Sequence, residues 1–301
     1  MRRIPACVLL LALALLALPA WAEEEAKAPK TGGNFEVEVH KNIPYVEGKD
    51  GDERQKLDLY LPKGGRDYPT LFFIHGGGWT AGSRSGFDKI GRTFARNGVA
   101  FVSVGYRLSA KQGQEAKGGQ VKHPGHIQDV AKGFAWTVAN ISKYGGDPGQ
   151  IFVSGHSAGG HLAALLATDD DYLKAEKLSL KNIKGVIPVS GVFVVSPRMK
   201  NIFGDDAEVC KKASPQNHAR EGLPPFLIFY GDAEANQLGR QAEAFAPALK
   251  AKKVEASVVV GKDRNHGSIM MRMAAEDDPA TQAILEFIAK HSNLKLTPKE
   301  K

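Results

Sequence analysis

Hydrophobic and polar residues follow two different patterns along the chain. In residues 35–41 (FEVEVHK) and 56–61 (KLDLYL) they alternate, which predicts strands with one face in solvent, and hence antiparallel edge strands. After Pro62 the pattern changes to short runs that are apolar throughout, at residues 70–74, 99–104, 150–154, 186–189, 226–230 and 254–260. Candidate helices lie between these runs, near residues 86–97, 126–143, 158–168, 235–252 and 278–291. Buried strands that alternate with helices predict an α/β fold with a mostly parallel central sheet, antiparallel N-terminal strands and helices on both faces.

Two stretches interrupt this alternation. Residues 107–122 are rich in Gly, Gln and Lys and are predicted to form a mobile surface loop. Residues 191–224 contain several prolines and mixed charge, and predict a small, irregular cap inserted between two strands. Parallel α/β sheets build their ligand sites at the carboxyl ends of the strands, so we expect both stretches to border the ligand pocket.

The N-terminus has the three parts of a secretory signal peptide. Met1-Arg2-Arg3 is basic, residues 7–18 are all apolar, and Ala20-Trp21-Ala22 forms a small-x-small cleavage site ahead of Glu23. The apolar run is too short for a spanning helix, although an uncleaved anchor is the alternative. We therefore predict a signal peptide over residues 1–22, a disordered leader over 23–34 and one α/β domain over 35–295. The expected location is secreted or periplasmic.

Composition and charge exclude several classes of protein. The 301 residues are 43% hydrophobic and 24% charged, which is unlike collagen-like, disordered or multi-span membrane proteins. The net charge of +7 is spread out, without a basic stripe that carries aromatic residues, so no nucleic-acid partner is predicted. Cys7 lies in the apolar leader, which leaves Cys210 alone after cleavage and excludes an internal disulfide. We expect no stable membrane insertion after cleavage, and the sequence leaves the oligomeric state open.

The pentapeptide Gly155-His156-Ser157-Ala158-Gly159 lies between a predicted strand (QIFVS) and a predicted helix (AGGHLAALLAT). In a G-x-S-x-G motif the serine occupies a tight turn that its glycine neighbours permit, and the turn exposes the hydroxyl. The N-terminus of the following helix favours negative charge on a substrate oxygen. The pentapeptide alone could be a chance Gly-rich turn, but its strand–turn–helix context favours a nucleophile elbow, with Ser157 as the nucleophile.

A second glycine-rich segment, His75-Gly76-Gly77-Gly78-Trp79, directly follows the predicted strand at residues 70–74. Glycines at a strand end let backbone amides approach a substrate oxygen, so Gly76 and Gly77, together with Ala158, are predicted to form an oxyanion hole. A phosphate-binding loop is the alternative, but neither G-x-x-x-x-G-K-[ST] nor a dinucleotide fingerprint is present. His75 is expected to organise this loop by hydrogen bonding.

A serine nucleophile needs an acid and a base, which follow it in chain order in this kind of fold. Of the nine histidines, only His218, His266 and His291 lie well downstream. His266 has the expected position of the base, in a loop between the last predicted strand and the last predicted helix. The acid should follow the strand at residues 226–230, where Asp232 and Glu234 compete. Asp is the commoner residue type in this role and Glu also serves, so the choice is open at this point.

Together, HGGGW, GHSAGGHLA, SP…PPFLIFYGD and the late histidine resemble hormone-sensitive-lipase-like α/β-hydrolases over about residues 55–291. The resemblance is strongest to small bacterial carboxylesterases that are similar to feruloyl esterases and to N-formylkynurenine formamidase. It implies the α/β-hydrolase fold and a serine triad. In such proteins a G-x-x-D pattern follows the strand, and its last residue is the triad acid. That position here is Glu234, with Asp232 as the alternative acid.

The expected function is that of an exported serine carboxylesterase that hydrolyses small, short-acyl esters through an acyl-enzyme. The small cap at 191–224 provides no long helical lid, which is why short acyl chains are expected. An amide hydrolase similar to N-formylkynurenine formamidase is one alternative, and a non-catalytic binding module on the same fold is another. No cofactor or metal is predicted: H-E-x-x-H and Cys/His clusters are absent, His156 and His161 merely flank the elbow, and residues 169–171 form an acidic turn.

Overall fold

The computed structural model describes residues 35–48, 51–64, 66–116, 118–234 and 237–296. The predicted signal peptide at residues 1–22 and the predicted leader at 23–34 lie outside the described residues. Within these ranges, no helix is both long enough and apolar enough to cross a membrane.

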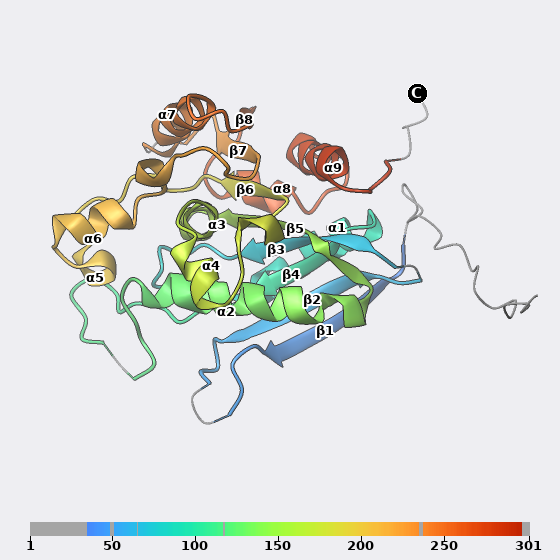
Figure 1. The fold of residues 1–301 in the computed structure, drawn as a ribbon, viewed down its shortest axis with the longest axis horizontal. Helices are drawn as coiled ribbons and strands as arrows, with labels where there is room; N and C mark the ends of the chain where they lie inside the picture. The colour runs from blue at the N-terminus through green and yellow to red at the C-terminus, as the bar shows by residue number, and fades with distance from the viewer. Residues whose placement is uncertain (1–34, 49–50, 65, 117, 235–236, 297–301) are drawn as a thin grey trace, which may run out of the picture.

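Eight strands of the described chain form one sheet at the centre of the molecule (Figure 1). They are β1 (Val37–Pro44), β2 (Lys56–Pro62), β3 (Tyr68–Ile74), β4 (Ala100–Val104), β5 (Gly146–His156), β6 (Gly185–Val189), β7 (Phe226–Gly231) and β8 (Ala256–Gly261). Their order across the sheet is β1-β2-β4-β3-β5-β6-β7-β8. β2 pairs antiparallel with both β1 and β4, and all other neighbours are parallel. The predicted α/β fold with antiparallel N-terminal strands is confirmed.

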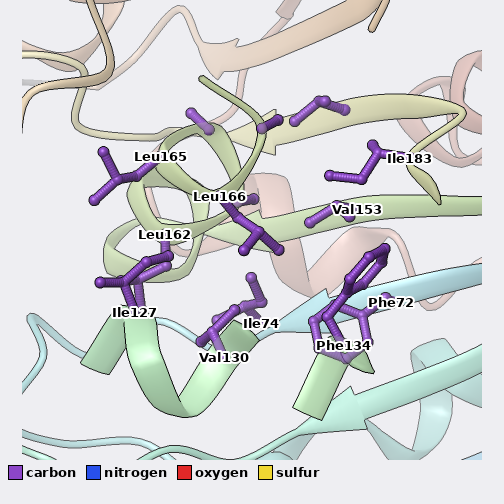
Figure 2. Packing of buried hydrophobic residues seen from close by; sticks show 14 of the residues in the cluster. Phe72, Ile74, Ile127, Val130, Phe134, Val153, Leu162, Leu165, Leu166 and Ile183 are labelled. Atoms are coloured by element: carbon purple, nitrogen blue, oxygen red, sulfur yellow. The ribbon is translucent and has the colours of Figure 1, made fainter. Parts of the chain in front are cut away.

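Helices cover both faces of this sheet. One face carries α2 (Gly125–Asn140), α3 (Ala158–Thr168) and α7 (Leu238–Lys250), and the other carries α1 (Asp88–Arg96), α8 (Ser268–Arg272) and α9 (Pro279–His291). In β3, Phe72 and Ile74 pack toward α2 and α3 (Figure 2), whereas Leu71 and Phe73 pack in the opposite core. Successive residues of a strand point to opposite faces, so a strand covered on both sides is apolar throughout. The five predicted helices are confirmed, and α4 (Asp171–Ala175), α5 (Lys200–Phe203), α6 (Ala207–Lys212) and α8 were not predicted.

The prediction of two half-exposed edge strands is wrong for β2. β1 is the edge strand, but β2 lies between β1 and β4 and is almost entirely buried. Tyr60 is buried because α1 covers that face of the sheet. The buried carboxylate of Asp58 accepts hydrogen bonds from the Asn42 amide (2.8 Å) and from Nε of Arg84 (3.2 Å). A polar residue in an alternating pattern is therefore not always in solvent, since a paired charge can be buried.

The two irregular stretches pack against each other. Residues 108–110 are buried, whereas residues 111–116 and 118–120 are exposed, so the predicted surface loop at 107–122 is exposed mainly after its first four residues. The segment 191–224 contains α5, α6 and a 3₁₀ turn at Pro215–His218. Nδ2 of Asn201 in α5 donates to the Ala110 carbonyl at 2.9 Å, and the His123 amide donates to the Ile202 carbonyl at 2.8 Å. The insertion is thus held against the loop by one side-chain and one backbone hydrogen bond.

Candidate active site

The G-x-S-x-G motif forms a sharp turn between β5 and α3. Ser157 has φ 56° and ψ −117°, a conformation that is rare and strained for a non-glycine residue. A Cβ on Gly155 would lie 2.4 Å from the Gly159 carbonyl oxygen, and one on Gly159 would lie 2.0 Å from the Ile74 oxygen. The turn is also held by the Ser157 amide, which donates to the Val189 carbonyl on β6 at 2.9 Å. The structure therefore has the elbow geometry that the motif predicts.

The HGGGW loop lies directly beside this elbow. A Cβ on Gly76 would lie 2.8 Å from the His156 carbonyl oxygen and 3.2 Å from the Ser157 Cβ, so only a glycine lets the loop approach so closely. Gly77 has φ 112°, and its carbonyl accepts from the Ala81 amide at 3.0 Å, which closes a tight turn. Neither the Gly76 amide nor the Gly77 amide donates to another described residue. The Ala158 amide, at the first position of α3, has no acceptor within its own helix. Three amides are thus available for a substrate oxygen.

His75 stabilises this loop by ring stacking and hydrogen bonding. Its ring stacks on Tyr106 with centroids 4.3 Å apart, and its Nδ1 donates to the Gly76 carbonyl at 2.8 Å. The Tyr106 hydroxyl donates to the His75 carbonyl at 3.0 Å. Burial lowers the pKa of His75 to about 4, so the ring is neutral at neutral pH. These contacts agree with the organising role that the sequence predicts.

His266 and Glu234 meet next to the elbow. Nδ1 of His266 lies 3.7 Å from Oε2 of Glu234, and the Glu234 side chain is 1% exposed against 37% for His266. Neither of these two atoms has a hydrogen-bond partner among the described residues. The distance is longer than a hydrogen bond, but such contacts are often loose before substrate binds. A small rotation of the imidazole would satisfy both atoms at once.

The other oxygen of Glu234 is fixed by two donors. Oε1 accepts from the Ser190 hydroxyl and from the Gly231 amide, the latter at 3.1 Å. Burial acts to raise the pKa of the Glu234 carboxyl, but the nearby His266 and the hydrogen bonds from Ser190 and Gly231 outweigh burial and lower the pKa below its usual value. The carboxylate is therefore charged at neutral pH, and its Oε2 can accept a hydrogen bond from His266.

Asp232 contacts different groups from Glu234. Its carboxylate is exposed and accepts from the Arg264 amide at 3.2 Å, while its own amide donates to the Gly261 carbonyl at 3.0 Å. Hydrogen bonds from the backbone amides of Asp263 and Arg264 lower the pKa of Asp232. Asp232 thus joins the loop after β7 to the loop that carries His266. Of the two acids that the sequence leaves open, Glu234 is the one beside the imidazole.

His156 and Ser190 contact these groups and were not predicted to do so. The His156 ring lies 4.6 Å from the His266 ring, and its Nε2 donates to the His266 carbonyl at 2.7 Å. Burial, together with the nearby His266, lowers the pKa of His156 to about 4, so it is a neutral donor. The sequence feature that could have indicated His156 is its position directly before Ser157. The feature that could have indicated Ser190 is that it is a polar residue directly after a predicted strand.

The two remaining downstream histidines lie elsewhere. His218 contacts the Lys212 carbonyl at 2.7 Å within the insertion. His291, at the end of α9, lies 3.4 Å from the carboxylate of Glu255. Neither histidine contacts the elbow, whereas His266 does through His156.

The residues considered for a metal are engaged in other contacts. His161 on α3 is buried and its Nε2 contacts the Ala213 carbonyl at 2.7 Å, so it does not face the same group as His156. In the acidic turn, Asp170 pairs with Arg220 at 2.9 Å. The described part of the chain contains no group of three or more His, Cys, Asp or Glu residues that could hold a metal ion.

The chain is similar in sequence to known esterases and to a formamidase. The model of the family named BD-FAE matches residues 57–249. The chain is 30% identical over 224 residues to esterase LipC of Mycobacterium tuberculosis, which covers 66% of this chain and 53% of LipC. It is 24% identical over 262 residues to the kynurenine formamidase of Salmo salar, which covers 83% of this chain and 82% of that protein. The chain spans about half the length of the curated esterases that it matches.

Solved structures share the fold over most of the chain. Esterase 2 of Thermogutta terrifontis, phosphoramylated by tabun, matches with a TM-score of 0.65 at 26% identity. The match covers 87% of this chain and 94% of that one.

Proposed function

The chain belongs to the BD-FAE family of hormone-sensitive-lipase-like α/β-hydrolases, and we propose that it is an exported serine carboxylesterase. The observation that carries the proposal is the pairing of His266 with the buried carboxylate of Glu234, directly beside the strained elbow that holds Ser157. A nucleophile, a base and an orienting acid in one place are what acyl transfer to a hydroxyl requires. The printed names of LipC and of the Thermogutta protein as esterases agree with this chemistry.

The proposed reaction has two halves. In the first, His266 takes the proton from Ser157 Oγ while that oxygen attacks the ester carbonyl carbon. The negative oxygen of the tetrahedral intermediate binds the amides of Gly76, Gly77 and Ala158. The C–O bond to the alcohol then breaks, and His266 gives its proton to the leaving oxygen. In the second half, His266 activates water, which attacks the acyl-enzyme and releases the acid and the free serine.

Glu234 stabilises the imidazolium that forms in each half. Its charge is kept at neutral pH by the donors on Oε1, so Oε2 can accept the Nδ1 proton of His266. Without that acceptor, the imidazole could present the wrong nitrogen to Ser157.

A formamidase-type amide hydrolase is the second candidate. It is favoured by one observation, since the match to the Salmo salar kynurenine formamidase extends over 82% of that protein, against 53% for LipC. A predicted signal peptide argues for the ester reaction, because an exported enzyme would not meet a cytosolic tryptophan catabolite. A substrate panel that contains acetyl, butyryl and feruloyl esters and a formyl anilide would distinguish ester hydrolysis from amide hydrolysis. The class of substrate with the larger kcat/KM would identify the activity.

Export is part of the proposal. Cleavage after about Ala22 would release the chain into the periplasm or the medium. The intact mass of protein recovered from those fractions would test it, since the full-length mass in membranes would instead indicate an anchor.

A serine-directed probe tests the nucleophile. Because the Thermogutta esterase reacts with tabun, an alkyl fluorophosphonate is expected to label the wild-type protein once, on the peptide that contains Ser157. Ser157→Ala should abolish labelling and lower kcat by about 10³-fold or more. Ser257→Ala, at an exposed serine on β8, is the matched control and should leave both unchanged. Near-wild-type turnover by Ser157→Ala would exclude the proposed nucleophile, and an unlabelled, inactive wild type would favour the binding module.

A further inference from the structure

The C-terminal end of β6 contacts both the proposed nucleophile and the proposed acid. The carbonyl of Val189, the last residue of β6, accepts from the Ser157 amide at 2.9 Å. The hydroxyl of the next residue, Ser190, donates to Oε1 of Glu234. Two consecutive residues thus contact Ser157 and Glu234, which are 77 positions apart in the chain.

The backbone at this corner is held in a strained conformation. Ser190 is buried and has φ 49°, in the left-handed region that favours glycine. Its amide donates to the Phe229 carbonyl on β7 at 2.7 Å. On the other side, a Cβ on Gly160 would lie 2.9 Å from the Cα of Gly191, so α3 passes very close to the corner. Strain of this kind persists where surrounding contacts fix it, and glycine would relieve it.

The hydroxyl of Ser190 is what distinguishes it from glycine at this position. It donates to one oxygen of a carboxylate whose side chain is 1% exposed, and the other oxygen faces His266. Glutamate has one more rotatable bond than aspartate, so more contacts are needed to fix its carboxylate in one orientation. The Gly231 amide supplies one donor to Oε1, and Ser190, which directly follows β6, supplies the second. Two donors in different directions fix the plane of the carboxylate, which a single donor does not.

We propose that Ser190 is a positioning residue that orients Glu234 so that its Oε2 faces the imidazole of His266. This inference rests on the proposed function and extends it. Ser190 does not touch the reacting atoms, and its effect passes entirely through Glu234. Loss of the hydroxyl would leave a buried carboxylate free to rotate about its last bond and less able to accept the Nδ1 proton.

The principal test uses two substitutions with opposite effects on stability. Ser190→Ala removes the hydroxyl and keeps the backbone strain, whereas Ser190→Gly removes the hydroxyl and relieves the strain. Both should lower kcat on an aryl ester by roughly tenfold, with KM within about twofold, after correction for the fraction of sites labelled by the fluorophosphonate. Ser190→Gly should nevertheless unfold at a temperature no lower than the wild type. Unchanged kcat in Ser190→Gly would overturn the proposal, because the hydroxyl would then be dispensable.

A double-mutant cycle separates positioning from a general structural role. In the background Glu234→Ala, the further change Ser190→Gly should alter kcat by less than about twofold, since the group that it orients is gone. A tenfold loss in that background would mean that Ser190 acts elsewhere and would overturn the proposal. Ser154→Ala is the matched control: Ser154 is also buried and its hydroxyl donates to the Ile187 carbonyl at 2.7 Å, with no contact to the triad. It should cost stability but leave kcat within about twofold.

These outcomes are distinguishable from failure of the proposed function. If wild-type protein neither reacts with the fluorophosphonate nor hydrolyses any substrate of the panel, the esterase proposal fails. If the wild type is active and both Ser190 variants match it, the positioning role alone fails.

Discussion

At the scale of single residues, two carboxylates two positions apart have different partners, and this difference is testable. Glu234 is buried beside His266, whereas Asp232 is exposed and bonds to the Arg264 amide. Glu234→Gln is expected to lower kcat by roughly 10²- to 10⁴-fold, because the amide cannot stabilise the imidazolium. Asp232→Asn should cost about tenfold or less, through the loop alone. Both are measured on one aryl ester, and the reverse ordering would assign the acid to Asp232.

Which residues were predictable depended on whether their geometry is local. The turn at Ser157 and the glycine loop at Gly76 could be predicted from sequence because both are set by neighbouring residues and by the strand ends that they follow. The choice between Asp232 and Glu234 could not be settled by spacing, because it depends on the direction of each side chain after β7. Ser190 escaped notice because its contact with Glu234 joins two loops that are distant in sequence.

At the scale of elements, the insertion at residues 191–224 contains only short helices. Its longest helix among the described residues, α6, has 6 residues, and Phe203 of α5 fills the space between Trp79 and His161 with ring centroids 5.2 and 5.6 Å away. We expect acetyl and butyryl esters to be hydrolysed with kcat/KM at least about tenfold above decanoyl esters, since each unburied methylene forgoes its transfer energy. Rates should show no jump at the critical micelle concentration. Faster hydrolysis of emulsified long-chain lipids would contradict this expectation.

The long elements could be predicted from the sequence, and the shortest helices could not. Eight strands and five long helices follow from apolar periodicity, because each must bury a face against the sheet. The helices α4, α5, α6 and α8 have at most 6 residues, which is too short for a helical period to register. β2 was misjudged for a different reason. Its polar residue Asp58 is paired with Arg84 rather than solvated, and pairing between distant segments leaves no local pattern.

At the scale of the whole molecule, buried neutral histidines make stability depend on pH. Burial lowers the pKa of five histidines from an ordinary value of 6.5, to about 4 for His75, His123 and His156 and to about 3 for His126 and His161. The unfolded chain therefore binds more protons than the folded protein below pH 6.5. Stability is complete above that pH and is lost as the pH falls toward 4, by up to about 1.4 kcal/mol per pH unit for each fully buried histidine.

We therefore expect the urea midpoint to change little between pH 7 and pH 6.5 and to fall from there to pH 5, before most carboxylates titrate. His123→Gln removes one of these groups, and its ring lies against Phe203 rather than against the proposed triad. The variant should show a shallower dependence on pH, by about one proton taken up on unfolding. The proton uptake can be measured directly from the slope of the unfolding free energy against pH. A urea midpoint that stays constant between pH 7 and pH 5 would mean that these histidines are solvated. The insertion would then not shield the core around α3 from solvent.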